Sequence, residues 1–341
     1  MVQLFDQSRT FCKPMIIRSV LILAGMTVIF QISIYVLEMK QQMMNKSYDE
    51  TEKLSEDDKT ANLSLDTLVF IQRREHMNEM CETYAHLHRN IFDNTKDLDH
   101  ILVDEKNKLL YCYVPKVACT NWKRVFMILM GTADSRNASS IPAEIVHKKS
   151  TFRKLSDYTI DEVKYFIENY TKYLFVRHPF ERLLSAFRNK LEERSQRSKY
   201  FQMRIGREII KHYRFNATNH SLEYGNDVTF EEFALYLIDH YVPSFNEHWK
   251  PISELCYPCL IKYDFIGKYE TLYSDAEFLL KSINKSYIKF PRVRVSNTTA
   301  QIIKYFNALP PYVIARLHNI FVLDFKLFSY STENVLGYEI G

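Results

Sequence analysis

The sequence predicts an α/β fold in which a central parallel sheet is flanked by helices. Residues 109–131 and 173–188 each begin as a short apolar run rich in aromatic and β-branched residues. After a short loop, each continues with apolar residues at helical spacing. The first loop contains Lys116, and Arg177 ends the second apolar run. Because the carboxyl ends of parallel strands meet at one edge of a sheet, the two units place both cations around one anionic ligand.

The N-terminal region is predicted to hold a membrane anchor. Residues 19–37 contain no charge and are long enough to span a bilayer as a helix. Basic residues precede this segment and acidic residues follow it, so residues 1–18 are placed in the cytosol and the rest of the chain in a lumen. The alternative is a cleaved signal peptide. The apolar run exceeds a usual h-region and no small-x-small site follows it, which favours a retained signal anchor.

The segment after the anchor is predicted to be a stem. Residues 38–90 are polar and acid-rich and show no strand or strong helix pattern, so we expect a flexible segment. The folded domain is then expected over residues 91–341. Eight N-x-[ST] sequons agree with a lumenal position. They begin at Asn45, Asn62, Asn137, Asn169, Asn216, Asn219, Asn284 and Asn297.

The cysteines fit the same compartment. Cys12 lies on the cytosolic side, and Cys112 and Cys119 lie in or beside the first loop. This leaves Cys81 and the two cysteines of CYPC at 256–259 as candidates for disulfides. Because CYPC has no second CxxC, we expect a structural bridge there and not a zinc site.

The first unit has the features of an anion-binding turn. Thr120 or Asn121 can cap its helix, Gly131 can end it, and Lys116 is left in the loop facing the helix N-terminus. Free N–H groups and the helix dipole converge there, and the lysine adds a full charge. The loop contains no glycine, so it is not a GxxxxGK[ST] loop. On this stretch alone, an ordinary turn with a chance lysine explains the pattern equally well.

The second unit places an arginine at the end of a strand. Pro179 takes the first helical position. Ser185 lies off the apolar stripe of the helix, so its hydroxyl can point back toward a ligand of Arg177. The guanidinium suits a terminal phosphate because its planar fork donates two hydrogen bonds at once. The alternative is that Arg177 pairs with Glu181 or Glu193.

Two long motifs resemble those of a known family. YVPKVACTNWKR (113–124) and FVRHPFERLLSAFRNKL (175–191) resemble the 5′-phosphosulfate loop and the 3′-phosphate motif of Golgi carbohydrate sulfotransferases. Within sulfotransferase family 2, they are most similar to the group of chondroitin, dermatan and GalNAc 4-O-sulfotransferases. The resemblance runs from about residue 98 to 330 and includes FNEHW (245–249). It implies a P-loop-like sulfotransferase domain in a type II Golgi membrane enzyme, without a metal cofactor.

The resemblance also implies a donor and its binding residues. The sulfuryl donor is 3′-phosphoadenosine-5′-phosphosulfate (PAPS), and the acceptor is a sugar hydroxyl. Where the family usually carries an acidic residue, this chain has His178. The implied PAPS-binding residues are Pro115, Lys116, Val117, Ala118, Cys119, Thr120, Asn121, Arg177, His178, Pro179, Phe180, Glu181, Arg182, Leu183, Leu184 and Ser185.

Sulfuryl transfer needs positioning and charge stabilisation more than covalent help. Lys116 is the candidate for stabilising the leaving oxygen. A general base must take the proton of the acceptor hydroxyl. His147 is the first candidate, because it resembles a catalytic histidine found in this interval in related enzymes. His248, in FNEHW, is the second. A structural role remains open for each histidine.

The acceptor is predicted to be a glycan, and the predicted sulfation site is the 4-position of GalNAc in chondroitin or dermatan. Residues 188–214 contain nine Lys or Arg and three Glu, an excess of +6 against +4 for the whole chain. Such a run is often a solvated helix face, but it also attracts a polyanionic glycan. A nucleic acid is not expected in a lumen, and the sequence does not indicate an oligomeric state. The basic stretch 289–299 is predicted to close over the nucleotide.

Other functions share some of these features. A lumenal glycosyltransferase would use the D-x-D motif at 97–99, although that tripeptide is short and common. A nucleotide kinase is disfavoured by the missing glycine-rich loop. A glycan-binding receptor would leave the paired cationic loops unexplained. Cys81 with His86 and His88 lacks an evident fourth ligand, so no metal site is expected.

Overall fold

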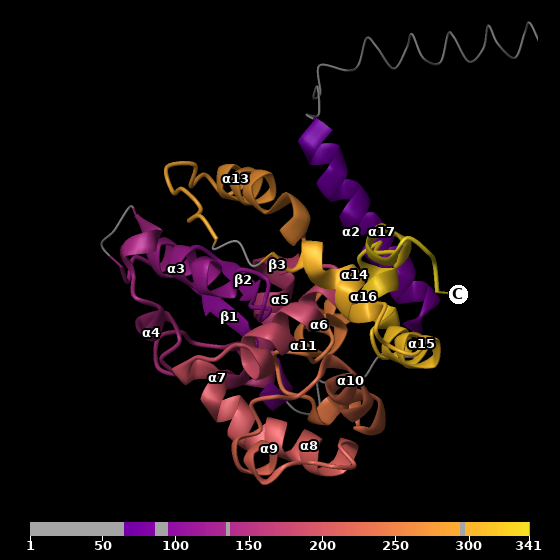
Figure 1. Cartoon of the computed structure of the whole chain (residues 1–341). Helices are drawn as coiled ribbons and strands as arrows, with labels where there is room; N and C mark the ends of the chain where they lie inside the picture. Colours follow the sequence, from indigo (N-terminus) through magenta and orange to yellow (C-terminus); the bar gives the residue numbers. More distant parts are fainter. Residues whose placement is uncertain (1–64, 86–94, 134–136, 294–296, 341) are drawn as a thin grey trace, which may run out of the picture. The chain divides into compact units, whose positions relative to one another are not determined.

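The computed structural model describes residues 65–85, 95–133, 137–293 and 297–340. The expected cytosolic tail, the membrane anchor at 19–37 and the first part of the stem lie outside these residues. Within the described ranges, no helix is long and apolar enough to cross a membrane. The described chain combines one small sheet with many helices (Figure 1).

The sheet has four strands in the order β1-β2-β3-β4. Strands β2 (Leu109–Cys112), β3 (Thr171–Val176) and β4 (Phe265–Lys268) are parallel neighbours, with Tyr111 opposite Tyr173. The two strands predicted from the motifs are therefore adjacent and parallel. The sheet is mixed, however, because β1 (Ile101–Asp104) pairs antiparallel with β2. A short turn joins these two strands, which allows the antiparallel edge.

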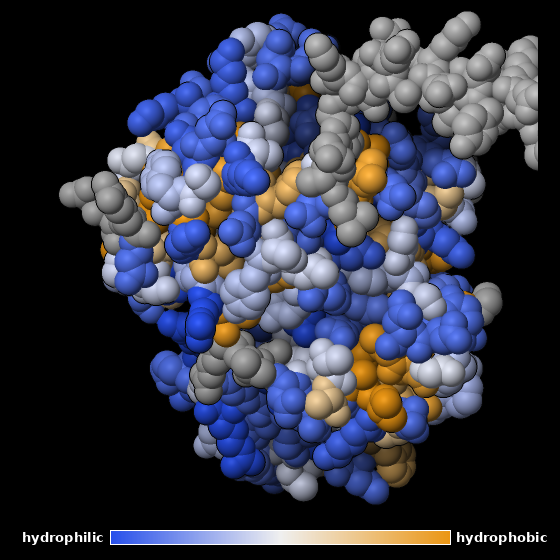
Figure 2. All heavy atoms as spheres, turned by 90° about the horizontal axis from the view of Figure 1, so that it is seen from above, coloured by the Kyte–Doolittle hydropathy of each residue, from blue (hydrophilic) through white to orange (hydrophobic). Residues whose placement is uncertain are grey.

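The helices surround the sheet and extend to one side of it, where α7 to α10 gather at the bottom of Figure 1. Hydrophilic residues cover most of the face shown in Figure 2. The helices are α2 (Leu65–Thr83), α3 (Cys119–Met130), α4 (Ala143–Val146), α5 (Ile160–Asn169), α6 (Pro179–Phe187), α7 (Gln196–Phe201), α8 (Arg207–Tyr213), α9 (Asn219–Tyr224), α10 (Phe230–Asp239), α11 (Ile252–Cys256), α12 (Pro258–Ile261), α13 (Leu272–Ser282), α14 (Ile302–Phe306), α15 (Pro311–Ile320), α16 (Val322–Leu327) and α17 (Glu333–Leu336). Arg188–Glu192 and Gln202–Gly206 are π-helical turns.

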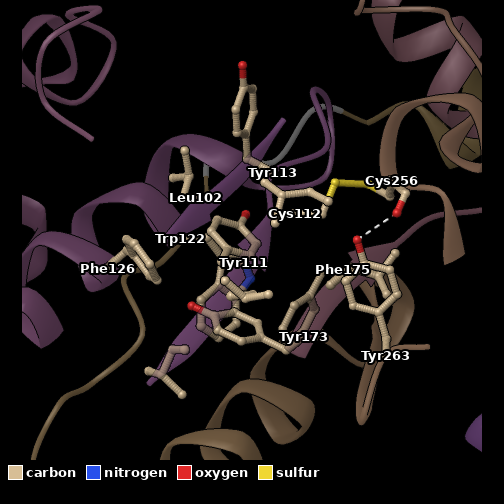
Figure 3. Close-up of a cluster of buried hydrophobic side chains, with 14 of the residues drawn as sticks. Leu102, Tyr111, Cys112, Tyr113, Trp122, Phe126, Tyr173, Phe175, Cys256 and Tyr263 are labelled. Atoms are coloured by element: carbon tan, nitrogen blue, oxygen red, sulfur yellow. Dashed lines mark hydrogen bonds between the residues drawn. A yellow bond between two sulfur atoms is a disulfide. The ribbon is translucent and has the colours of Figure 1, made fainter. Parts of the chain in front are cut away.

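The core consists of two clusters of buried side chains. In the first, Tyr111 of β2 stacks on Tyr173 of β3 with ring centroids 4.9 Å apart, and Trp122 of α3 packs on Phe175 at 4.3 Å (Figure 3). The second cluster lies around α6, α10 and α15. Helix α6 is buried along all nine of its residues, because it lies between the sheet edge and the second cluster. The strand ends that carry the predicted site are thus set in a rigid frame.

Helix α2 corrects the predicted boundary of the stem. Residues 65–83, which were expected to be flexible, form a helix that belongs to the same compact unit as the rest of the domain, Ser64–Gly341. Phe70 stacks on both Phe265 and Phe278, with ring centroids 4.4 Å away in each case. Arg73 pairs with Asp275 at 2.6 Å. The apolar residues of α2 do not form a strong stripe along one face of the helix. The sequence pattern therefore does not indicate a helix that packs against the domain.

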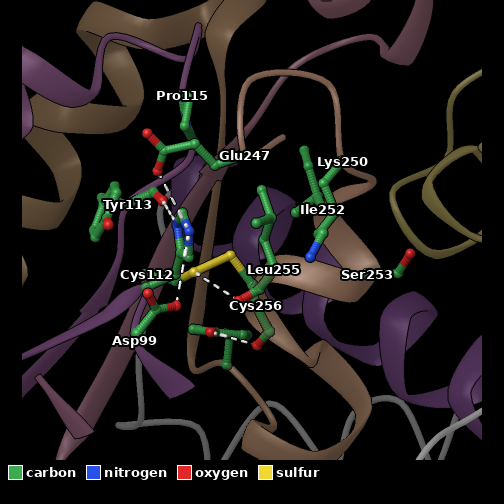
Figure 4. The surroundings of a disulfide bond; sticks show 12 residues. Asp99, Cys112, Tyr113, Pro115, Glu247, Lys250, Ile252, Ser253, Leu255 and Cys256 are labelled. Carbon is green, nitrogen blue, oxygen red and sulfur yellow. Dashed lines mark hydrogen bonds and ion pairs between the residues drawn. A yellow bond between two sulfur atoms is a disulfide. The ribbon is translucent and has the colours of Figure 1, made fainter. Parts of the chain in front are cut away.

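The disulfides confirm the three expected candidates, Cys81, Cys256 and Cys259, and add Cys112 as the fourth partner. Cys81 of α2 pairs with Cys259, and Cys112 of β2 pairs with Cys256 (Figure 4). The two cysteines of CYPC therefore hold two different elements and are not bridged to each other. Cys112 was not among the predicted disulfide candidates, because it was placed in or beside the first loop. It lies at the end of β2 and points toward α11. Among the described cysteines, only Cys119 has a free thiol.

Phe70→Ala tests whether α2 is part of the folded domain. The variant should lower the free energy of unfolding by about 3 kcal/mol, because it removes a buried ring that stacks on two others. Leu68→Ala is the matched control on the same helix, since Leu68 is 43% exposed, and it should change that energy by less than about 0.5 kcal/mol. Urea denaturation measures both. Equal losses in the two variants would contradict the packing described here.

Candidate active site

The loop between β2 and α3 forms a cradle of N–H groups without any glycine. Lys116 and Ala118 both adopt left-handed backbone conformations, with φ of 71° and 52°. Ala118 occupies the N-cap of α3 and its side chain makes no capping hydrogen bond. The expected caps, Thr120 and Asn121, lie instead inside the first turn of the helix. The C-terminal end follows the prediction, because Gly131 is the left-handed C-cap.

The N–H groups of this loop remain available for a ligand. Within the described residues, the N–H groups of Lys116, Ala118, Cys119 and Thr120 donate to no carbonyl of the chain. Successive N–H groups in such a turn form an anion-binding concavity, and the twelve-residue helix α3 adds the positive end of its dipole. The geometry therefore fits a phosphate or sulfate group at the start of α3.

The amine of Lys116 is partly buried beside this cradle and makes no hydrogen bond or ion pair within the described chain. Burial, followed by the neighbouring charges of Lys190 and Arg177, lowers the pKa of Lys116 to about 8. A cation crowded by other cations gains stability from a bound anion. The predicted role of Lys116 as an anion ligand is compatible with this position.

Arg177 follows β3 and lies against the same loop. Its Nη1 atom is 3.5 Å from the carbonyl oxygen of Lys116, so the two motifs meet at adjacent strand ends. Arg177 also pairs with Glu181 at 3.0 Å, which is one of the two pairings given as the alternative to a ligand role. Its guanidinium stacks on the ring of Tyr269 at 4.2 Å. The pair is buried and adjoins the cradle, so it orients Arg177 and does not form a surface salt bridge.

The other residues of the second motif have different environments. His178 is buried, with Nε2 3.0 Å from the carbonyl of Ser331, and its ring contacts Phe325 and Tyr330. Its side chain is thus held by the C-terminal segment. Ser185 is buried on α6, and its hydroxyl makes no hydrogen bond within the described chain. The remaining members, Pro179, Phe180, Leu183 and Leu184, are buried residues that position α6.

Arg182 connects the loop to a distant segment. Its Nε donates to the carbonyl of Pro115 at 3.0 Å, and its two terminal nitrogens donate to the carbonyls of Lys250 at 2.6 Å and Glu247 at 3.0 Å. Burial lowers the pKa of Arg182 to about 10. In this structure Arg182 donates to main-chain carbonyls, so it sets the spacing between the Lys116 loop and FNEHW.

His248 lies in the turn that Arg182 holds. Its Nδ1 is 2.7 Å from Oδ1 of Asn246, which can only accept, so Nδ1 carries the proton and Nε2 keeps a lone pair. Burial and the charges of Lys190, Lys116 and Arg182 lower the pKa of His248 to about 2. The ring is therefore neutral at pH 7 and lies close to the Lys116 amine.

His147 ends α4 on the other side of the loop. Its Nε2 is 2.9 Å from the hydroxyl of Thr120, in the first turn of α3. Partial burial of the ring, followed by Lys123, Arg197 and Lys190, lowers the pKa of His147 to about 4. Both candidate bases thus flank the loop as neutral imidazoles, but His147 is exposed and its Nε2 already has a partner.

Comparison with known proteins identifies the family. The model of the sulfotransferase family matches residues 99–331. The chain belongs to the sulfotransferase family. Carbohydrate sulfotransferase 11 of Rattus norvegicus is 41% identical over 281 residues, covering 80% of this chain and 79% of that protein. Carbohydrate sulfotransferase 9 of Homo sapiens is 38% identical over 269 residues, covering 76% and 60%. No solved structure matches significantly.

The family assignment confirms the resemblance carried by the two motifs. Carbohydrate sulfotransferase 14 of Danio rerio is also similar, at 40% identity over 241 residues, which are 70% of this chain and 64% of that protein. The matched region contains both strand–loop–helix units and FNEHW. In this sulfotransferase the units lie side by side at one edge of the sheet.

Several residues near the site were not singled out from the sequence. Lys190, in the π-helical turn after α6, is among the charges that act on Lys116, His147 and His248. Lys123 is buried on α3, with its amine 3.5 Å from the ring centroid of Tyr113. Both residues lie within the two motifs, but helical spacing alone does not indicate which lysines turn inward.

Part of the basic stretch 289–299 lies against the loop. The side-chain amide of Asn121 donates to the carbonyls of Pro291 and Arg292, at 3.2 and 3.3 Å. Asn121 is thus occupied by the protein and holds this stretch beside the first turn of α3. The end of the stretch includes residues 294–296, which lie outside the described ranges.

The D-x-D motif at 97–99 lies in the turn before β1. Asp97 and Asp99 lie at the start of the domain, and Asp99 is 3.9 Å from the ring of His100. Within the part of the chain that the structure describes, no group of three or more His, Cys, Asp or Glu is arranged to hold a metal ion.

Arg182→Lys tests the connection between the loop and FNEHW. Lysine keeps the charge but cannot reach three carbonyls from one planar group, so the free energy of unfolding should fall by about 1–3 kcal/mol. The control is Arg197→Lys, because Arg197 forms an exposed pair with Glu144 that contributes little. Calorimetry of both variants provides the measurement. A loss in Arg182→Lys no larger than in Arg197→Lys would contradict the role given to Arg182.

Proposed function

We propose that this sulfotransferase transfers a sulfuryl group from PAPS to a glycan hydroxyl, with the 4-position of GalNAc in chondroitin or dermatan as the acceptor. The observation that carries the proposal is the cradle of free N–H groups beside Lys116 and Arg177 at adjacent strand ends. It suits a ligand with two separate anionic groups, one at each loop. The names of the relatives, which are carbohydrate sulfotransferases, support a sugar acceptor.

In the proposed reaction the acceptor oxygen bonds to sulfur, its proton moves to a base, and the bond from sulfur to the phosphate oxygen breaks with its electron pair on that oxygen. The N–H groups of Ala118, Cys119 and Thr120 and the amine of Lys116 stabilise the charge of the leaving phosphate. Arg177, oriented by Glu181 and Tyr269, binds the 3′-phosphate. Arg182 contributes by fixing the distance between the loop and the base.

We assign the base to His248 ahead of His147. Asn246 fixes the tautomer of His248 and leaves Nε2 able to accept a proton, whereas Nε2 of His147 lies against Thr120. Burial lowers the pKa of His248 most, and the charges of Lys190 and Lys116, which a bound donor would neutralise, lower it further. The base therefore gains basicity once the donor is bound, which favours proton transfer in the loaded enzyme.

The basic residues of segment 188–214 support a glycan acceptor only in part. Several of its cations are paired within the protein, since Arg214 binds Asp227 and Glu232, and Arg188 pairs with Glu192. Lys190 faces the site and is better placed to interact with the transferred group. We propose that the unpaired, exposed remainder attracts the anionic glycan.

We further propose that the protein resides in the Golgi membrane with the described domain in the lumen. The six described sequon asparagines, Asn137, Asn169, Asn216, Asn219, Asn284 and Asn297, are all exposed. Two disulfides link distant parts of the domain, as is usual for proteins of oxidising compartments. The uncharged segment 19–37 provides the membrane anchor.

Donor binding is tested on the full-length protein in detergent micelles. Adenosine 3′,5′-bisphosphate should raise the melting temperature without added metal, because the binding groups are N–H groups and cations of the chain. Its affinity should be about tenfold weaker at pH 9 than at pH 7, because Lys116, with a pKa of about 8, loses its proton between these values.

Lys116→Arg is the control for the pH effect, since arginine stays charged at pH 9. Its affinity should vary little between the two pH values. Stabilisation by a UDP-sugar with Mn²⁺ only would overturn the proposed function in favour of a glycosyltransferase. Disaccharide analysis of chondroitin after incubation with labelled PAPS identifies the sulfated position.

The base is tested by replacing each histidine. With PAPS saturating, His248→Ala should lower kcat by about 10²- to 10⁴-fold, as expected for loss of a general base. His147→Ala should have a much smaller effect, because its contact with Thr120 only borders the loop. The reverse order of the two effects would assign the base to His147.

A further inference from the structure

Glu247 lies between two histidines beside the candidate site. Its Oε2 is 3.4 Å from Nε2 of His100, and its Oε1 is 3.9 Å from Nδ1 of His248. The main chain of Glu247 is fixed separately, because its carbonyl accepts a hydrogen bond from Arg182. Figure 4 shows Glu247 above the Cys112–Cys256 disulfide, with Asp99 on the opposite side. The carboxylate therefore has a defined position next to the base.

His100 holds one oxygen of this carboxylate in place. The His100 ring is buried and stacks on Tyr113 with centroids 4.4 Å apart, and its Nδ1 is 3.2 Å from the carbonyl of Tyr113. Its Nε2 faces Glu247 and, at 3.9 Å, Asp99. All of these neighbours are acceptors, so a neutral His100 can donate to only one side of its ring at a time. Burial lowers the pKa of His100, and the two carboxylates oppose that effect.

The charges around His248 show what the carboxylate contributes. Lys190 of the π-helical turn, Lys116 of the loop, Arg182 of α6 and His100 all disfavour a positive charge on the His248 ring. Among the described residues, Glu247 is the only one with a carboxylate oxygen within 4.0 Å of a ring nitrogen of His248. Asn246 also supports Nδ1, but with a neutral amide oxygen. A proton arriving at Nε2 would therefore create an imidazolium ion whose one close anion is Glu247.

We infer that Glu247, held by His100, is a positioning residue that stabilises the His248 imidazolium formed when the acceptor hydroxyl gives up its proton. The inference rests on the proposed function, in which His248 is the base. One oxygen of Glu247 lies 3.4 Å from Nε2 of His100, and the other lies 3.9 Å from Nδ1 of His248. The arrangement also ties the base to the donor loop, because Tyr113 precedes Pro115 and Lys116 in the chain.

Glu247→Gln tests this role, because it keeps the shape of the side chain and removes the charge. We expect kcat to fall about 10- to 100-fold while the KM values for PAPS and for the acceptor stay within about twofold. The acidic limb of the kcat–pH profile should move to lower pH, since His248 loses the anion that favours its protonated form. Equal melting temperatures of variant and wild type would show that the fold is intact.

Glu254→Gln is the matched control. Glu254, on α11, lines the same cavity of about 250 Å³ as Glu247 and His100, and it is not among the main charges that shift the pKa of His248. This variant should keep the kcat and the pH profile of the wild type. Transfer by the wild type together with equal kcat values in Glu247→Gln and Glu254→Gln would overturn the inference alone. Absence of any transfer by the wild type would overturn the proposed function, and the inference with it.

The interaction between Glu247 and His100 can also be measured without catalysis. In NMR titrations, the pKa of His100 should be lower in Glu247→Gln than in the wild type, because the carboxylate that favours the imidazolium is gone. The His100 signal is assigned by its loss in His100→Gln. Glu254→Gln should leave the pKa of His100 unchanged. A His100 pKa that does not respond to Glu247→Gln would overturn the proposed fixation of the carboxylate.

Discussion

The buried guanidinium of Arg182 joins three carbonyls from two segments that are distant in the sequence. Pro115 belongs to the loop that carries Lys116, and Glu247 and Lys250 flank the turn that carries His248. Because the fork of arginine is planar, three hydrogen bonds from one group leave little freedom to either segment. The distance between the anion cradle and the candidate base depends on this group, and so does the orientation of Glu247.

The electrostatics of the site follow from this close assembly. Lys116, Lys190 and Arg177 are crowded around the start of α3, and their mutual repulsion is relieved by a ligand with negative charge. Burial, with Lys190 and other nearby cations, keeps His147 and His248 neutral. The site therefore favours binding of an anionic donor, and the charge of the bound donor then favours proton transfer to the base. Glu181, paired with Arg177, and Glu247, beside His248, provide the negative charges that orient this cationic cluster.

Much of the local structure was predictable, and the long-range contacts were not. The apolar runs and the loop cations predicted adjacent parallel strands, and Pro179 and Gly131 marked helix ends correctly. The helix cap was wrong, because Ala118 takes a left-handed conformation that residue type does not favour. Helix α2 was missed, since its attachment depends on stacking with Phe265 and on a disulfide to Cys259.

The sequence by itself determined the family, the two anion-binding motifs and the residue types available for chemistry, because these depend on local patterns along the chain. The tertiary structure decided which of those residues act together. Lys190, His100 and the adjacent pair Glu247 and His248 come from three separate segments, and only folding brings them around Lys116. Partners more than sixty residues apart leave no periodic signal, and their contact depends on packing around the buried Arg182.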